Sequence, residues 1–162
     1  MNKNNWIDVL IQWKKDNKIP WIEYKNHQIG FPEKRKIIKE ITELELNWNE
    51  QMPSLIQLPK EIARMTQLTR LNLYGHKLIE LPKEIGELVS LKELDIGANC
   101  LEDLPPEILK LTNLIELNLY GNKKLTLTEK QKNWILSLEK KGCNIQVDNF
   151  SNLTPLPSNL HF

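Results

Sequence analysis

A repeat of 23 residues is the feature that most limits what this chain can fold into. The pentapeptide LNLYG occurs at residues 71–75 and again at 117–121, which are 46 residues, or twice 23, apart. Two full copies of a longer template fill residues 68–90 and 91–113, and a third copy begins at Leu114. The template has Leu or Ile at positions 1, 4 and 6, Asn or His at position 9, and Leu-Pro at positions 14 and 15. This period predicts a stack of similar units, because no single unit buries its apolar face alone.

The spacing of apolar residues changes within each unit. In the LxLxx segment it is two, which predicts a strand with one buried face. In the LPKEIGEL segment at residues 81–88 it is three or four, with Pro82 expected at the first helical position and Glu84 in the first turn. Each unit is therefore expected to form one strand and one short helical turn.

The pattern LxxLxLxxNxLxxLPxxIxxLxx resembles the 23-residue, bacterial-type leucine-rich repeat, and the resemblance covers residues 19–148. It implies an α/β fold, a short right-handed horseshoe with a parallel β-sheet on its concave side and helical caps at both ends. In this family an asparagine at position 9 bonds to the backbone of adjacent coils. The corresponding residues here are Asn49, His76, Asn99 and Asn122.

A degenerate first unit, beginning at Ile19 and ending in Phe31 and Pro32, places His27 in the same slot as His76. For both histidines the alternative is a metal ligand or a general base. A metal needs further ligands, and no acid or cysteine cluster accompanies these histidines at a fitting spacing. We therefore expect structural roles for both.

We expect four segments: a capping helix within 1–18, repeats at 19–127, a capping helix and strand at 128–148, and an extended tail at 149–162. In the N-terminal helix, Asn5 is the expected N-cap, and the expected apolar face consists of Trp6, Val9, Leu10 and Trp13.

In the C-terminal helix, Thr128 and Gln131 form a capping box, and Gly142 ends the helix. The expected apolar face consists of Trp134, Ile135 and Leu138. A strand at 144–147 is expected to join the sheet, with Cys143 buried before it.

The unit at residues 41–67 is four residues longer than the others, and the extra residues lie near Met52 and Pro53. Insertions in repeat proteins go to loops on one face, often the binding face. A surface loop without a function is the alternative, because lengthening such a loop costs little free energy of folding.

Composition and motifs favour a binding protein over an enzyme. The formal net charge of +1 gives no basic surplus for nucleic acid, and no run of about eighteen apolar residues is present for a membrane span. Cys100 and Cys143 fit free thiols in a reducing compartment, and no signal peptide is recognisable, so we expect a cytoplasmic monomer. GxSxG, GxxxxGK and HExxH motifs are absent, and we expect no catalytic residues, cofactor or metal.

The outward positions of the strands are the expected binding surface. Position 3 of successive units holds Trp21, Glu43, Arg70, Glu93 and Glu116, and position 5 holds Glu23, Glu45, Asn72, Asp95 and Asn118. Six carboxylates against one arginine make an acidic face, and aromatic side chains next to it are favoured as anchors in protein interfaces. The expected partner is a protein or peptide with basic residues. The predicted contact residues are Trp48, Tyr74, Tyr120, Glu45, Arg70, Glu93, Asp95, Glu116 and Asn118.

Three alternatives stay open. Arg70 lies between Glu43 and Glu93 and could neutralise both, which would leave an ordinary polar surface. A delivered effector or surface recognition protein would use the same face on a foreign target. An enzyme with an unrecognised site would instead show a deep pocket with several titratable groups.

Overall fold

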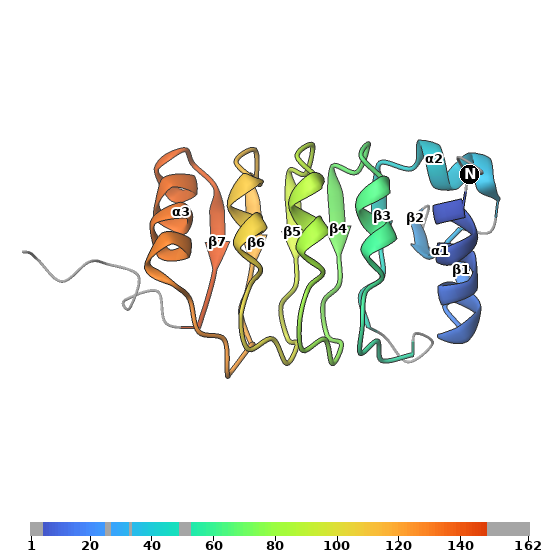
Figure 1. Cartoon of the computed structure of the whole chain (residues 1–162), viewed down its shortest axis with the longest axis horizontal. Helices are drawn as coiled ribbons and strands as arrows, with labels where there is room; N and C mark the ends of the chain where they lie inside the picture. Colours follow the sequence, from blue (N-terminus) through green and yellow to red (C-terminus); the bar gives the residue numbers. More distant parts are fainter. Residues whose placement is uncertain (1–4, 25–26, 33, 49–52, 149–162) are drawn as a thin grey trace, which may run out of the picture.

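A computed structural model of the protein describes residues 5–24, 27–32, 34–48 and 53–148. Within these residues, five parallel strands form one sheet. Three 3-10 helices lie along one side of this sheet (Figure 1). The strands, in spatial as well as sequence order, are β3 (Glu43–Glu45), β4 (Arg70–Asn72), β5 (Glu93–Asp95), β6 (Glu116–Asn118) and β7 (Asn144–Gln146). The helices are η1 (Lys60–Arg64), η2 (Lys83–Glu87) and η3 (Pro106–Lys110). We call one strand with the loops and helix that follow it a coil.

The sheet register aligns the repeated leucines. Leu44, Leu71, Leu94 and Leu117 are direct neighbours on successive strands, and each is at most 1% exposed. Because side chains alternate along a strand, the residues on either side of each leucine face outward. The predicted parallel strands, with one buried face, are confirmed.

The helical segments begin later than expected. Pro82 has an extended backbone (φ −62°, ψ 138°) and precedes η2 as its N-cap instead of opening the helix. Its carbonyl accepts a hydrogen bond from the Ile85 N–H, the i to i+3 pattern of a 3-10 helix. One turn of this narrow helix suffices to bury Ile85, as it buries Ile62 in η1 and Ile108 in η3.

The N-terminal helix α1 (Asn5–Asp16) covers the first coil and contacts η1. Ile7 and Leu10 of this helix are fully buried, whereas Val9 is 37% exposed, so the expected apolar face was wrong at Val9. Asn5 is the first helical residue and not the residue before the helix. Trp13 packs edge-on against Phe31, with ring centroids 5.8 Å apart.

The expected degenerate first repeat is wrong. Residues β1 (Trp21–Tyr24) and β2 (His27–Gly30) pair antiparallel in a separate two-stranded sheet, with Tyr24 opposite His27. Two residues lie between these strands, whereas a parallel pair needs a crossover of a dozen residues or so. Trp21 and Glu23 therefore do not extend the outward columns, and His27 does not occupy the slot of His76. Helix α2 (Arg35–Glu40) then leads into β3.

The C-terminal end follows the prediction closely. Helix α3 (Glu129–Lys140) begins with the Thr128–Gln131 capping box and buries Trp134, Ile135 and Leu138. The positive φ of Gly142 (90°) ends it, and the chain enters β7 with Cys143 buried. The predictions for Asn49, Met52 and the tail at 149–162 lie outside the described residues. The division into four segments stays a prediction.

Candidate functional site

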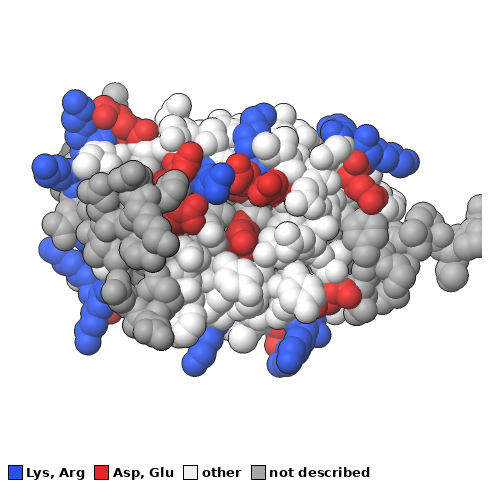
Figure 2. All heavy atoms as spheres, turned by 180° about the vertical axis from the view of Figure 1, so that it is seen from behind, with Lys and Arg blue, Asp and Glu red and all other residues white. Residues whose placement is uncertain are grey.

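The register assembles two outward columns of polar side chains along the sheet. Glu43, Arg70, Glu93 and Glu116 are neighbours in one column, and β7 adds Asn144 to it. The other column consists of Glu45, Asn72, Asp95, Asn118 and Gln146. Viewed from the side of the sheet, acidic side chains gather in the middle of the molecule (Figure 2). We call this surface the sheet face.

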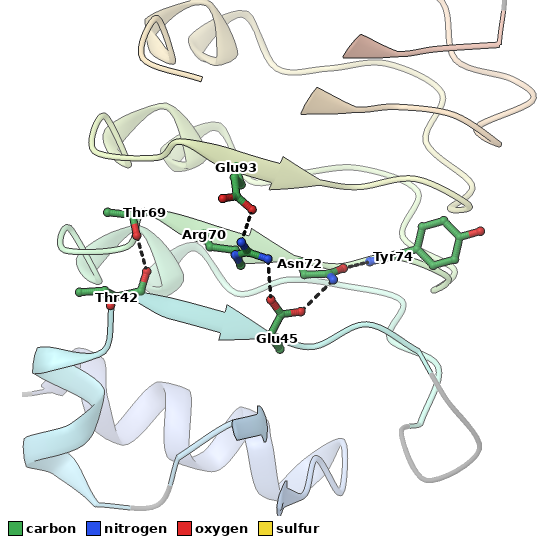
Figure 3. A network of polar contacts seen from close by, with 7 residues as sticks. All are labelled: Thr42, Glu45, Thr69, Arg70, Asn72, Tyr74 and Glu93. Carbon is green, nitrogen blue, oxygen red and sulfur yellow. Dashed lines mark hydrogen bonds and ion pairs between the residues drawn. The ribbon is translucent and has the colours of Figure 1, made fainter. Parts of the chain in front are cut away.

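Arg70 is the one basic residue in the described part of these columns, and it is already paired (Figure 3). Its guanidinium bonds Glu93 at 2.7 Å and lies 3.8 Å from Glu45. The expected partner Glu43, directly opposite Arg70, forms no ion pair with it. The longer reach to Glu45 is favoured because the Asn72 amide holds that carboxylate at 2.8 Å.

The five carboxylates of the sheet face are therefore only partly neutralised. Among the described residues, no lysine or arginine forms an ion pair with Asp95 or Glu116. Burial raises the pKa of Asp95 above its usual value; hydrogen bonds from the Gly97 N–H and the Asn118 amide oppose the shift, and the nearby Glu116 adds a smaller repulsion in the same direction as burial. Burial likewise raises the pKa of Glu45, although Asn72 and Arg70 oppose the shift. A cation from outside would relieve this repulsion.

The sheet face is hollowed only slightly at its acidic centre. A depression of about 90 Å³ is lined by Glu45, Arg70, Asn72, Glu93, Asp95 and Glu116. Over the described residues, no group of three or more His, Cys, Asp or Glu side chains is placed to hold a metal ion. The shape suits one side-chain head group better than an enclosed substrate.

Three aromatic side chains lie just past the strands. Trp48, Tyr74 and Tyr120 are 49%, 41% and 57% exposed. The backbone continues its ladder there, with the Trp48 N–H bonded to the Tyr74 carbonyl at 2.7 Å. A Cβ on Gly75 would stand 3.1 Å from the Cβ of Trp48, so the glycine leaves room for the tryptophan. The ring of Tyr74 lies beyond the end of β4, clear of the Arg70 ion pairs (Figure 3).

The ladder at position 9 is built as predicted in the described coils. Asn99 accepts from the Leu78 N–H and donates to the carbonyls of Leu73, Ile96 and Gly97. Asn122 makes equivalent bonds one coil later, to Leu101, Ile96 and Leu119. These buried amides tie the coils together, so they are structural and not available to a ligand.

His76 takes the same role with a longer side chain. Its Nδ1 accepts from the Leu55 N–H at 3.2 Å, and its Nε2 bonds the Leu46 carbonyl. Asn99 bridges Leu73 and Leu78, which are five residues apart, whereas His76 bridges Leu46 and Leu55, which are nine apart. The imidazole therefore joins the two ends of the segment that contains the four extra residues. Burial lowers the pKa of His76, which keeps the ring neutral.

Some parts of this face were missed from the sequence. Asn144 and Gln146 extend both columns, and the register of β7 could have been inferred from the apolar Ile145 between them. The Asp148 carboxylate accepts a hydrogen bond from the Gly121 N–H at 2.8 Å, and the ladder that runs past Tyr120 ends with this bond. Gly97, which occupies the position of Tyr74 and Tyr120 in the intervening coil, was not singled out either. The binding role of the predicted contact residues stays a prediction, although the structure places them on one side of the molecule.

The solved structures that are similar to the chain include a leucine-rich repeat protein and an ice-binding protein. A leucine-rich repeat protein of Leptospira interrogans is 37% identical, with a TM-score of 0.53, over 66% of this chain and 25% of its own length. The fold of this chain is a leucine-rich repeat solenoid. A plant ice-binding protein shares the fold at 20% identity, with a TM-score of 0.52, over 82% of this chain and 53% of its own.

The chain thus spans about a quarter of the bacterial leucine-rich repeat protein and about half of the plant protein. No protein-family model and no curated protein matches the sequence. Among the described residues, none of the helices has the length and apolar character needed to cross a bilayer.

Proposed function

We propose that this chain is a non-catalytic protein-interaction module whose sheet face binds a basic segment of a partner protein. The observation that carries the proposal is the combination on one face of five carboxylates, one arginine that is already paired, and exposed aromatic rings at the end of the strands. The similarity to a leucine-rich repeat protein supports an interaction role in general.

The charges support a partner rich in lysine or arginine. Like charges on adjacent strands cost stability, and Glu93 and Glu116 are direct neighbours. A basic partner would offset this cost on binding. Because such attraction is screened, the association rate should fall as salt concentration rises.

The aromatic side chains support a protein partner over a small ion. Tyrosine and tryptophan are the residues most often found as hot spots in interfaces. Trp48 and Tyr74 are neighbours along the backbone ladder, and Tyr120 lies two coils further on. In this proposal the acids orient the segment and the rings supply contact area.

The test is a partner captured from lysate and then titrated by calorimetry against the Tyr74→Ala/Tyr120→Ala double variant. We expect a loss of about 2 kcal/mol or more of binding free energy if the two rings are hot spots. The control is Val89→Ala/Ile115→Ala, because both of these side chains are exposed and lie before the strands instead of after them. Equal affinity of the tyrosine variant and wild type, with both folded, would rule out this face as the binding site.

A further inference from the structure

The three coils from β4 to β6 share one turn at the end of each strand. The side-chain oxygen at position 5 accepts from the backbone N–H two residues later: Asn72 from Tyr74, Asp95 from Gly97, and Asn118 from Tyr120, each at 3.0 Å. The backbone ladder continues through them, with Gly75 bonded to Gly97 and Ala98 bonded to Tyr120. Gly97 therefore occupies the rung between the two tyrosines.

Nothing in the backbone requires a glycine at this rung. Gly97 is not among the residues with positive φ, whereas Gly75 and Gly121 are. Its neighbours at the equivalent position carry full tyrosine side chains in the same turn. Gly97 thus contributes no ring between two exposed tyrosines whose backbone rungs are about 9.6 Å apart, twice the usual strand separation, and we call the place of this missing ring the gap.

The floor of this gap is polar. Gly97 is buried, because the carboxamide of Asn118 leans over it: a Cβ on Gly97 would stand 2.7 Å from the Asn118 Nδ2. The same amide bonds the Asp95 carboxylate. Because Asp95 also accepts from the Gly97 N–H, its carboxylate lies at one end of the gap.

We infer that the gap at Gly97, between Tyr74 and Tyr120, receives an arginine side chain of the partner, with Asp95 as the carboxylate that binds its guanidinium. This inference rests on the proposed function and names the side chain that the sheet face selects. Asp95 forms no ion pair with a lysine or arginine among the described residues, so the guanidinium of the partner would supply a counter-charge that Asp95 lacks.

Arginine fits the gap better than other side chains. A flat group in contact with a ring on each side needs about 7–8 Å between the rings, twice a carbon contact distance, and the backbone rungs that carry the two tyrosines are about 9.6 Å apart. The guanidinium is planar, stacks on aromatic faces, and donates in a fork to a carboxylate. Lysine has a compact, strongly hydrated head group, and a neutral aromatic group would leave Asp95 without a counter-charge.

The first experiment uses the full chain labelled with ¹⁵N and three capped pentapeptides with Arg, Lys or citrulline between glycines. Citrulline keeps the shape of arginine and lacks its charge. We expect saturable shifts of the Tyr74, Gly97 and Tyr120 amides with the Arg peptide. The affinity for the Lys peptide should be roughly fivefold lower, as expected for loss of stacking at an exposed site, and that for citrulline lower still.

The second experiment fills the gap. Gly97→Tyr places at this rung the residue that both neighbouring coils already carry, so the fold should tolerate it once the Asn118 amide moves. Gly97→Ala is the matched control, since it displaces the same amide without a ring. We expect Gly97→Tyr to lose the selectivity for Arg over Lys and Gly97→Ala to retain it.

The outcomes separate this inference from the proposed function. If Arg and Lys peptides shift the amides of β5 and β6 equally, the sheet face binds basic segments but the gap does not select arginine, and the inference is wrong. If neither peptide shifts any amide of the sheet face, both the inference and the proposed function fail. Because the peptide comparison uses wild-type protein, neither conclusion depends on the folding of a variant.

Discussion

At the scale of single residues, His76 shows how a histidine in the place of the usual asparagine accommodates a longer loop. Its ring reaches both Leu46 and Leu55, at the two ends of the long segment, where an asparagine in the next coil needs to reach residues only five apart. The ring can do this only when neutral, because Nδ1 must accept a hydrogen bond while Nε2–H donates one. Protonation would place a proton on Nδ1 against the Leu55 N–H.

Stability is therefore expected to fall on mild acidification. Burial lowers the pKa of His76 in the folded chain below the ordinary value of 6.5, so the unfolded chain binds the proton more tightly. The contribution of the neutral ring is complete above pH 6.5 and is lost as pH falls through the lower, folded pKa. Urea unfolding of wild type and His76→Asn between pH 7.5 and pH 5 measures this directly.

The pH profile of His76→Asn should be flatter than that of wild type. The variant is also expected to be less stable at pH 7.5 by about 1 kcal/mol, because one hydrogen bond is lost across the longer span. The other histidines are present in both proteins, so they cancel in the comparison. Parallel profiles would show that His76 does not couple protonation to folding.

At the scale of elements, the contact between η2 and η3 depends on Gly86. A Cβ at Gly86 would stand 2.3 Å from the carbonyl oxygen of Glu107, and backbone cannot move aside as a flexible side chain can. Gly86→Ala should therefore force the two helices apart and lower the free energy of unfolding by about 1–3 kcal/mol, the usual cost of overpacking.

Thermal or urea unfolding checks this prediction. Glu87→Ala is the matched control, because Glu87 is exposed in the same helix and its loss should change stability by less than about 0.5 kcal/mol. A Gly86→Ala variant as stable as the control would mean that the helices separate at little cost.

The sequence predicted the elements unevenly. Strands β4 to β6 and helix α3 could be predicted because leucines every 23 residues, the Thr128 cap and Gly142 each have one physical interpretation, and β3 and β7 could be predicted because apolar and polar residues alternate in them. The hairpin of β1 and β2 could not, because alternation of apolar residues is the same for parallel and antiparallel strands. Its best signal was the separation of only two residues between the runs, which is typical of a hairpin.

The site shows a similar limit. Period-two alternation was enough to predict the two columns and the side on which Tyr74 and Tyr120 lie. The choice of Glu45 over Glu43 by Arg70 depends on a hydrogen bond from Asn72, and the covering of Gly97 depends on the rotamer of Asn118. Such contacts between coils follow from packing, which a repeat template does not specify.

At the scale of the whole molecule, each coil contacts mainly its neighbours, so one coil should be removable. Deletion of residues 91–113 joins Ser90 to Leu114 and brings β4 beside β6, with Leu71 opposite Leu117. We expect a folded chain that unfolds in one cooperative transition. Its urea midpoint should be lower, and its free energy of unfolding should depend less steeply on urea concentration, because less surface is buried. Circular dichroism during urea unfolding is the measurement. An unfolded product would show that the coils are not interchangeable.

The close approach of η2 and η3 also bears on how the molecule bends. Neighbouring strands are about 4.8 Å apart, whereas the axes of packed α-helices are 8–10 Å apart. A large mismatch between these two spacings would curl the stack of coils into a tight arc. Narrow 3-10 helices in contact through Gly86 reduce that mismatch, so we expect only a small bend from one coil to the next. A nearly level platform accommodates an outstretched peptide, which rises about 3.3 Å per residue and covers the distance from one tyrosine to the other in about three residues.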